Sequence, residues 1–130
     1  MPIWTRNFVE RVEIVWDETL ALEGRAGFYD STGALKDMIQ SHLLQLLALT
    51  AMDPPNALNE RDFRNRKVGV FRAVKGLSSG DAKRQTVRAR YTAGEVEGRP
   101  VPAYADEEGI DPRRGTETFA QVALEIDNWR

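Results

Sequence analysis

Residues 34–52 have the sequence ALKDMIQSHLLQLLALTAM, and this stretch decides the fold. Its apolar positions recur every three or four residues, which is the spacing of an amphipathic helix. The apolar stripe consists of Leu35, Met38, Ile39, His42, Leu46 and Leu49, widened by Leu43, Leu44 and Leu47. A face this broad predicts a helix that is largely buried. Asp53-Pro54-Pro55 predicts where the helix ends, because proline lacks the amide hydrogen that a helix needs.

A membrane-spanning helix is the alternative interpretation of the same stretch. Polar residues such as Lys36, Asp37 and Gln45 interrupt it well before the roughly 18 apolar residues that a span requires. Residues 1–6 also lack the apolar run of a secretory signal. The chain has no cysteine, so no disulfide can form, and we expect a cytoplasmic protein that does not engage a membrane.

A second amphipathic helix is predicted on the far side of the prolines, over residues 60–75. Asn59 followed by Asp62 resembles a capping box, and apolar residues then recur at helical spacing until Gly76. Its outer face carries Arg61, Arg64, Arg66, Lys67, Arg72 and Lys75. We interpret this basic face as solvated rather than as an anion site. Residues 76–81 are predicted to be a linker.

Three segments alternate between polar and apolar residues, as half-buried strands do. They are residues 8–18, the segment around Val87, Ala89 and Tyr91, and the segment from Thr118 to Ile126. Residues 23–27 are predicted to form a turn, and the candidate helix caps after it are Asp30, Ser31 and Thr32. Residues 98–115 are predicted to form a long surface connection, which is also a candidate interface loop. One-sided strands are typical of antiparallel sheets. The pattern therefore predicts α+β architecture, an antiparallel sheet with helices packed on one face, rather than a doubly wound α/β fold.

Length and composition exclude several classes of protein. The chain has 130 residues, 42% of them hydrophobic, which fits one domain that removes roughly two thirds of its surface from water. The formal charge of -2 offers no positive field for nucleic acid. With no cysteine and a single histidine, no metal cluster is expected. The sequence also contains no glycine-rich motif for a nucleotide phosphate.

Three residues are candidates for chemistry. Histidine takes up and releases a proton near neutral pH, so His42 is the candidate general base, with a satisfied core histidine as the alternative. Asp37 lies five positions earlier, about 140° around an α-helix, and is either a ligand in the same cleft or a first-turn carboxylate favoured by the helix dipole. Glu18 has the parity of the apolar side of its strand, and either binds a ligand or pairs with Arg25. Polar groups without a nucleophile or metal set suit proton abstraction from a hydroxylated substrate.

Several motifs give the chain a family resemblance. The longest runs from Glu23 to Gln45 and has the sequence EGRAGFYDSTGALKDMIQSHLLQ. Shorter ones are Pro2-Ile3-Trp4, Ala51-Met52-Asp53-Pro54-Pro55, Arg64-Asn65-Arg66-Lys67-Val68, Arg90-Tyr91-Thr92-Ala93-Gly94, Gly115-Thr116-Glu117-Thr118-Phe119-Ala120 and Asn128-Trp129-Arg130. In this order they resemble glucose-6-phosphate dehydrogenase, in its actinobacterial style. The resemblance covers essentially the whole chain and about a quarter of the family's length. We therefore expect residues 1–130 to be a fragment of its C-terminal α+β domain.

The resemblance implies a reaction and a role for each candidate residue. The family oxidises β-D-glucose 6-phosphate to 6-phosphogluconolactone, with hydride transfer from C1 to NADP, in the pentose phosphate pathway. His42 stands where the family has the base that removes the C1 hydroxyl proton, and Asp37 and Glu18 stand where it binds substrate hydroxyls. Ser41 departs from the family's usual Asn, and Phe28 from its common Tyr.

The resemblance also implies missing parts. The family's NADP-binding Rossmann domain is expected upstream of this chain. The family's Asp-His-Tyr-Leu-Gly-Lys segment, also expected upstream, carries phosphate ligands and the anion that stabilises the protonated base. A substrate-binding Lys is expected downstream. We therefore expect the isolated chain to bind no NADP and to be inactive. Because the family's sheet forms its dimer interface, a homo-oligomer is expected. The alternative functions are a non-catalytic interaction and dimerisation module and an independent sugar-binding protein.

Overall fold

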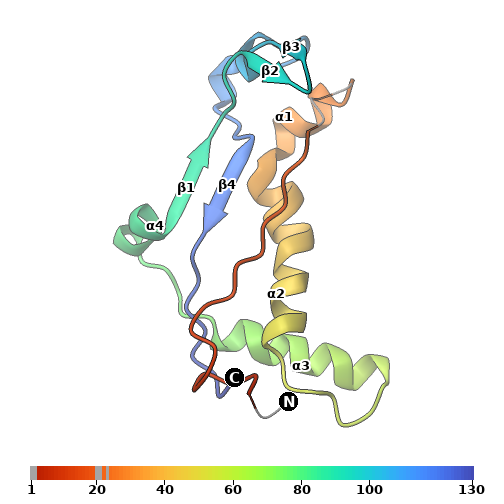
Figure 1. The fold of residues 1–130 in the computed structure, drawn as a ribbon, viewed down its shortest axis with the longest axis vertical. Coiled ribbons are helices and arrows are strands. Elements are labelled where there is room, and N and C mark those ends of the chain that lie inside the picture. Colours follow the sequence, from red (N-terminus) through yellow and green to blue (C-terminus); the bar gives the residue numbers. More distant parts are fainter. Residues whose placement is uncertain (1–2, 20–21, 23) are drawn as a thin grey trace.

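The computed structural model describes residues 3–19, 22 and 24–130, and it has α+β architecture as predicted. Its helices are α1 (Ala26–Ala34), the π-helix η1 (Leu35–Leu43), α2 (Leu44–Ala51), α3 (Glu60–Ala73) and α4 (Ser79–Gln85), with 3-10 turns η2 (Tyr104–Asp106) and η3 (Pro112–Arg114). Its strands are β1 (Thr86–Ala89), β2 (Gly94–Val96), β3 (Arg99–Val101) and β4 (Phe119–Val122). In Figure 1, α1, η1 and α2 form one rod, α3 crosses its lower end, and β1 and β4 lie beside it.

The helix predicted over residues 34–52 is confirmed, because η1 and α2 run without interruption from Leu35 to Ala51. Met52 then adopts an extended conformation ahead of the prolines. The prediction that this helix is largely buried is wrong. Ala34 and Ala48 are buried, but Leu46 and Leu49 each remain 43% exposed. The apolar face is broader than the rest of this chain can cover.

The second predicted helix is confirmed as α3. The Asn59 side chain accepts a hydrogen bond from the Asp62 amide, as expected of an N-cap. Asp62 does not complete the predicted box, since its carboxylate accepts instead from the Ala57 amide at 2.8 Å. The predicted linker over residues 76–81 is partly wrong. Residues from Ser79 onward form α4, whose start is fixed by a true capping box between Ser78 and Asp81.

The strand predicted over residues 8–18 is wrong, although the segment is extended beside the rod (Figure 1). It joins neither sheet in the part of the chain that the structure describes, and Trp16 is 58% exposed. Alternation reports that two faces differ in polarity, whereas a strand also needs a neighbour that accepts its backbone hydrogen bonds.

The two later strands are confirmed in part as β1 and β4, which pair antiparallel with Arg88 opposite Ala120. Both are shorter than predicted, since β1 ends before Tyr91 and β4 ends at Val122. The prediction of residues 98–115 as a surface connection holds for most of the segment, whose residues are exposed or half-buried with one exception, but it is incomplete. This segment contributes β3 to a hairpin with β2, and it also carries Tyr104, whose side chain is fully buried. Tyr104 packs edge-to-face against Tyr29 and Tyr91, with ring centroids 6.2 and 5.7 Å away. Its hydroxyl donates to Asp30 at 3.0 Å.

The start of the rod also differs from the sequence prediction. Helix α1 begins at Ala26, inside the turn predicted over residues 23–27, of which Glu23 lies outside the described residues. Asp30, Ser31 and Thr32 therefore lie within the helix and do not cap it. Asp30 is instead a buried acceptor for groups from the far end of the sequence.

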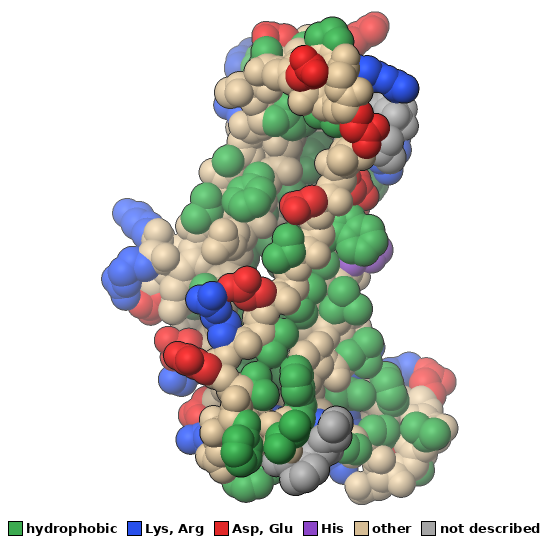
Figure 2. Space-filling model, in the orientation of Figure 1, with side chains coloured by type: hydrophobic (Ala, Val, Ile, Leu, Met, Phe, Trp, Pro, Cys, Tyr) green, Lys and Arg blue, Asp and Glu red, His purple; other side chains and the backbone are tan. Residues whose placement is uncertain are grey.

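The chain leaves much more surface exposed than expected. It exposes 9790 Å², whereas a compact monomer of 14.7 kDa exposes roughly 6,900 Å². It thus removes only about half of the unfolded chain's surface from water, and the prediction of two thirds is wrong. Figure 2 shows hydrophobic side chains along the lower half of the visible face. Among the described residues, no helix combines the length and the apolar character of a membrane span.

Candidate functional site

The π-helix η1 carries both Asp37 and His42. In a π-helix each amide bonds the carbonyl five residues earlier and each turn holds more residues, so residues five apart are separated by a much smaller angle than in an α-helix. Ser41 strengthens this spacing, because its hydroxyl donates to the Lys36 carbonyl, also five residues earlier, at 2.9 Å. The angle of about 140° expected for an α-helix therefore does not apply. Asp37 and His42 lie on one face of the same helix.

His42 lies on the surface of the rod. Its side chain is exposed, and η1 contains no buried residue. The alternative of a satisfied core histidine is therefore wrong for this chain. An exposed imidazole is free to meet a substrate or another part of a larger protein, so its assignment as the base stays a prediction.

The negative charges of Asp37 and Glu18 both act on the hydroxyl group of Tyr29 in α1. Burial, and after it the negative charge of nearby carboxylates, raises the pKa of Tyr29 to about 12. The carboxylates that act on it belong to Glu117, Asp37 and Glu18. The two predicted substrate ligands, one from a helix and one from the extended segment, thus both contribute to the raised pKa of one phenol.

Glu18 does not occupy the place that the sequence suggested. It does not end a strand, its side chain is exposed, and it accepts a hydrogen bond from Trp16 Nε1 at 3.3 Å. Among the ion pairs of the described residues, none joins Glu18 to Arg25. An exposed carboxylate beside an indole remains available to a ligand.

A buried carboxylate that the residue-by-residue reasoning missed lies at the start of η1. Glu117 precedes β4 and is 5% exposed. Its Oε1 accepts from the Leu35 amide at 2.9 Å, and its Oε2 accepts from Arg88 Nη2 at 2.7 Å. The only signal in the sequence was an acidic residue directly before an alternating strand pattern, and its role depends on the helix that contains Leu35, 82 positions away.

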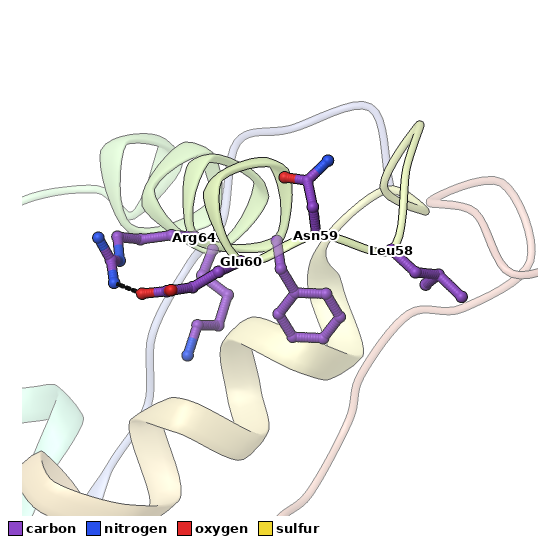
Figure 3. Close-up of a pocket in the computed structure, with 6 residues that line it drawn as sticks. Leu58, Asn59, Glu60 and Arg64 are labelled. Atoms are coloured by element: carbon purple, nitrogen blue, oxygen red, sulfur yellow. Dashed lines mark hydrogen bonds and ion pairs between the residues drawn. The ribbon is translucent and has the colours of Figure 1, made fainter.

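Two cavities lie outside this face. The larger, about 460 Å³, is formed by the loop before α3 and its first turns, with Leu58, Asn59, Glu60 and Arg64 around it in Figure 3. The smaller, about 270 Å³, contains Arg88 and Arg114. Both arginines are already paired, Arg88 with Glu117 and Arg114 with Asp30, so the charge available to an anion is small. None of the three predicted site residues lines either cavity.

Four of the six basic residues predicted on the outer face of the second helix contact other side chains of the chain. Arg66 donates to Asn56, Lys67 donates to Gln45, and Lys75 pairs with Glu125. Arg64 pairs with Glu60 one turn earlier, as Figure 3 shows. These contacts favour the interpretation of a solvated face over that of an anion site.

The described strands do not form a phosphate cradle of the Rossmann type. A phosphate cradle of the Rossmann type needs a parallel βαβ unit, and both strand pairs in the described chain are antiparallel. Within the described ranges no cluster of three or more acidic or histidine side chains could hold a metal ion. The face on η1 can offer a proton acceptor, His42, and one carboxylate, Asp37, that accepts hydrogen bonds from hydroxyl groups.

Comparison with known proteins covers the whole chain. The family described as "Glucose-6-phosphate dehydrogenase, C-terminal domain" matches residues 1–130. The chain is 46% identical over 129 residues to the glucose-6-phosphate 1-dehydrogenase of Treponema pallidum and 43% identical to that of Bacillus subtilis. The alignments cover 99% of this chain but only 25% and 26% of those proteins, so the chain spans about a quarter of their length.

Solved structures agree. The glucose-6-phosphate 1-dehydrogenase of Mycobacterium avium superposes with a TM-score of 0.82 and 36% identity over 99% of this chain and 26% of that chain. A glucose-6-phosphate dehydrogenase in complex with glucose-6-phosphate gives a TM-score of 0.70 and 32% identity over 85% of this chain and 22% of its own. On the match over residues 1–130, this chain belongs to the family of glucose-6-phosphate dehydrogenase C-terminal domains.

Proposed function

We propose that this chain is part of an NADP-dependent dehydrogenase that oxidises β-D-glucose 6-phosphate to the lactone, and that it supplies the proton acceptor. The proposal is carried by the placement of Asp37 and His42 on one face of η1, in a chain whose whole length matches the family. A substrate complex among the solved structures that resemble the chain supports the same sugar phosphate as substrate.

In this proposal His42 is the catalytic residue. Oxidation at C1 requires the C1 hydroxyl to lose its proton, and a neutral imidazole accepts it. Asp37 and Glu18 accept hydrogen bonds from other hydroxyls of the sugar and hold C1 near the ring. The protonated imidazole gains from a nearby anion, but among the described residues no ion pair involves His42. We infer that this anion is supplied by the remainder of the parent protein.

The cofactor site is also assigned to the remainder of the parent. The described residues contain no parallel βαβ unit, so NADP should bind elsewhere and the isolated chain should not bind it. We infer that residues 1–130 form one part of the parent's C-terminal domain, working in the cytoplasm. The actinobacterial subgroup stays a prediction, because the Treponema and Bacillus relatives share 46% and 43% identity with this chain, against 36% for the Mycobacterium structure.

The test is reduction of NADP by glucose 6-phosphate, followed by NADPH absorbance. The parent protein should turn over, and the isolated chain should not. In the parent, His42→Asn should lower kcat by about 10²–10⁴-fold, the usual contribution of a general base. Arg72→Gln, an exposed position on α3, is the control and should leave kcat unchanged. Full activity of His42→Asn, or robust turnover by the isolated chain, would contradict the proposal.

A second function, an interaction and dimerisation module, is favoured by one observation. The chain exposes 9790 Å² and leaves large apolar residues such as Trp16 and Leu49 at its surface. Surface of this kind is typical of a part that another chain or another copy covers. Light scattering tests it, since association that grows with concentration is expected and a strictly monomeric chain at high concentration would contradict it. An independent sugar-binding role predicts heat on titration with glucose 6-phosphate, and its absence would exclude that role.

A further inference from the structure

The rod is not one continuous helix, because it breaks at Gly33. This residue has φ 72° and ψ 166°, a conformation that residues with a Cβ rarely adopt. The space is closed as well. A Cβ added to Gly33 would lie 2.6 Å from Glu117 Oε1, well inside contact distance. The break and the buried carboxylate therefore occupy the same point of the fold.

Glu117 satisfies the backbone of the helix that starts after the break. Its carboxylate accepts from the Leu35 amide at 2.9 Å, and its own carbonyl accepts from the Ala34 amide at 3.1 Å. The first amides of a helix have no partner within the helix, so these two bonds provide partners from β4's leading end. The direction in which η1 leaves the break is fixed by Glu117.

Glu117 is itself held as an anion. Burial alone would raise the pKa of its carboxyl, but hydrogen bonds from the Leu35 amide and from Arg88 outweigh burial and lower the pKa below its ordinary value. Arg88 on β1 donates through both Nη2 and Nε to Oε2, at 2.7 and 3.2 Å. The sheet and the helix are thus joined through one fully bonded carboxylate.

We propose that Glu117, anchored by Arg88, is a positioning residue that sets where Asp37 and His42 stand relative to the substrate. The inference rests on the proposed function. Asp37 lies two residues after Leu35, and His42 lies seven residues after Leu35, all within η1. A shift at the Leu35 amide therefore moves both side chains together. Misplacement of catalytic groups by about 1 Å costs on the order of 10²-fold in rate.

The chemistry of the clamp predicts graded effects. Glu117→Gln keeps an oxygen that accepts from the Leu35 amide, but its NH2 group faces the guanidinium of Arg88, so that two hydrogen-bond donors meet. Glu117→Ala removes both acceptors and leaves the Leu35 amide unpaired. Because Asp37 holds the sugar and His42 takes the proton, displacement of η1 should raise the KM for glucose 6-phosphate and lower kcat, while the KM for NADP is unchanged.

The experiment compares four variants in the parent dehydrogenase. Glu117→Ala should raise KM for glucose 6-phosphate and lower kcat/KM by on the order of 10²-fold, and Glu117→Gln should show the same change several-fold more weakly. Glu125→Gln, which removes an exposed partner of Lys75, is the matched control and should leave both constants unchanged. His42→Asn, the fourth, reports on the proposed function itself.

The outcomes separate the two proposals. If His42→Asn retains full activity, the proposed function fails. If His42→Asn is inactive while both Glu117 variants keep the parent's KM for glucose 6-phosphate, only the positioning role is overturned. A purely structural role would lower the melting temperature and the amount of active enzyme without moving that KM. If Glu117→Ala does not fold, Glu117→Gln decides by the same comparison.

Discussion

Replacing Gly33 by alanine tests the break in the rod. In an ordinary helix this change stabilises by about 1 kcal/mol, because alanine loses less backbone freedom on folding. At Gly33 two costs oppose that gain. A residue with a Cβ at φ 72° and ψ 166° costs about 1–3 kcal/mol. The new Cβ, 2.6 Å from Glu117 Oε1, also displaces the charged hydrogen bond to the Leu35 amide, worth about 1.5–3 kcal/mol.

The two costs, less the gain of about 1 kcal/mol, predict that Gly33→Ala lowers the free energy of unfolding by about 1.5–5 kcal/mol. It is measured by urea denaturation followed by far-ultraviolet circular dichroism. Gly69→Ala is the control, since Gly69 lies inside α3 with no atom within 4 Å of a new Cβ. It should stabilise by up to about 1 kcal/mol. If Gly33→Ala were as stable as the parent sequence, the explanation that the helix breaks at Gly33 for lack of room and of a suitable backbone conformation would be refuted.

Three further predictions follow from the described contacts. Asn59→Ala should lower the free energy of unfolding by about 1 kcal/mol, because it removes the cap on the Asp62 amide. Asn65→Ala, at an exposed position of the same helix, should change that free energy by less than about 0.5 kcal/mol, and equal effects of the two variants in urea melts would argue against the cap. Because the pKa of Glu117 is lowered in the folded chain, its ionised carboxylate stabilises the fold above pH 4.5, and this stabilisation is lost as the pH falls through the lower folded-state pKa. The melting temperature of Glu117→Gln should therefore fall less steeply with acid than that of the parent sequence, and equal slopes would contradict this. All three tyrosines of the chain have raised pKa values, with burial as the first cause. Tyrosinate absorbance should therefore develop well above pH 10.0, with Tyr29 near 12, and the stability of the fold should decrease as the pH rises through that range. Titration of the folded chain at the ordinary pKa of 10.0 would exclude the buried cluster of tyrosines.

The parts of the fold that could be predicted from sequence are those set by neighbours along the chain. Helices over residues 34–52 and 60–75 follow from local periodicity, and the Asn59 cap follows from local spacing. The strand predicted over residues 8–18 failed because pairing depends on a distant partner that alternation does not report. Tyr104 was missed because prolines and acids around it indicate a surface loop, while two of its partners, Tyr29 and Asp30, lie more than seventy positions away.

The candidate site divides in the same way. The residues His42, Asp37 and Glu18 were available from their chemistry and from the family resemblance. Their arrangement was not, because α- and π-helical spacings differ too little over nine residues to be told apart from apolar periodicity. Glu117 acts on a helix 82 positions away, so nothing in its own neighbourhood revealed its role.

The central claim is that one face of η1 presents His42 to C1 of the sugar with Asp37 beside it. The most direct measurement is a crystal structure of the parent dehydrogenase with glucose 6-phosphate bound. We expect an imidazole nitrogen of His42 at roughly 2.6–3.2 Å from the C1 oxygen, and the carboxylates of Asp37 and Glu18 on other hydroxyls. A sugar bound elsewhere, or a His42 ring turned away from C1 with Asp37 on the opposite side of the helix, would contradict the account.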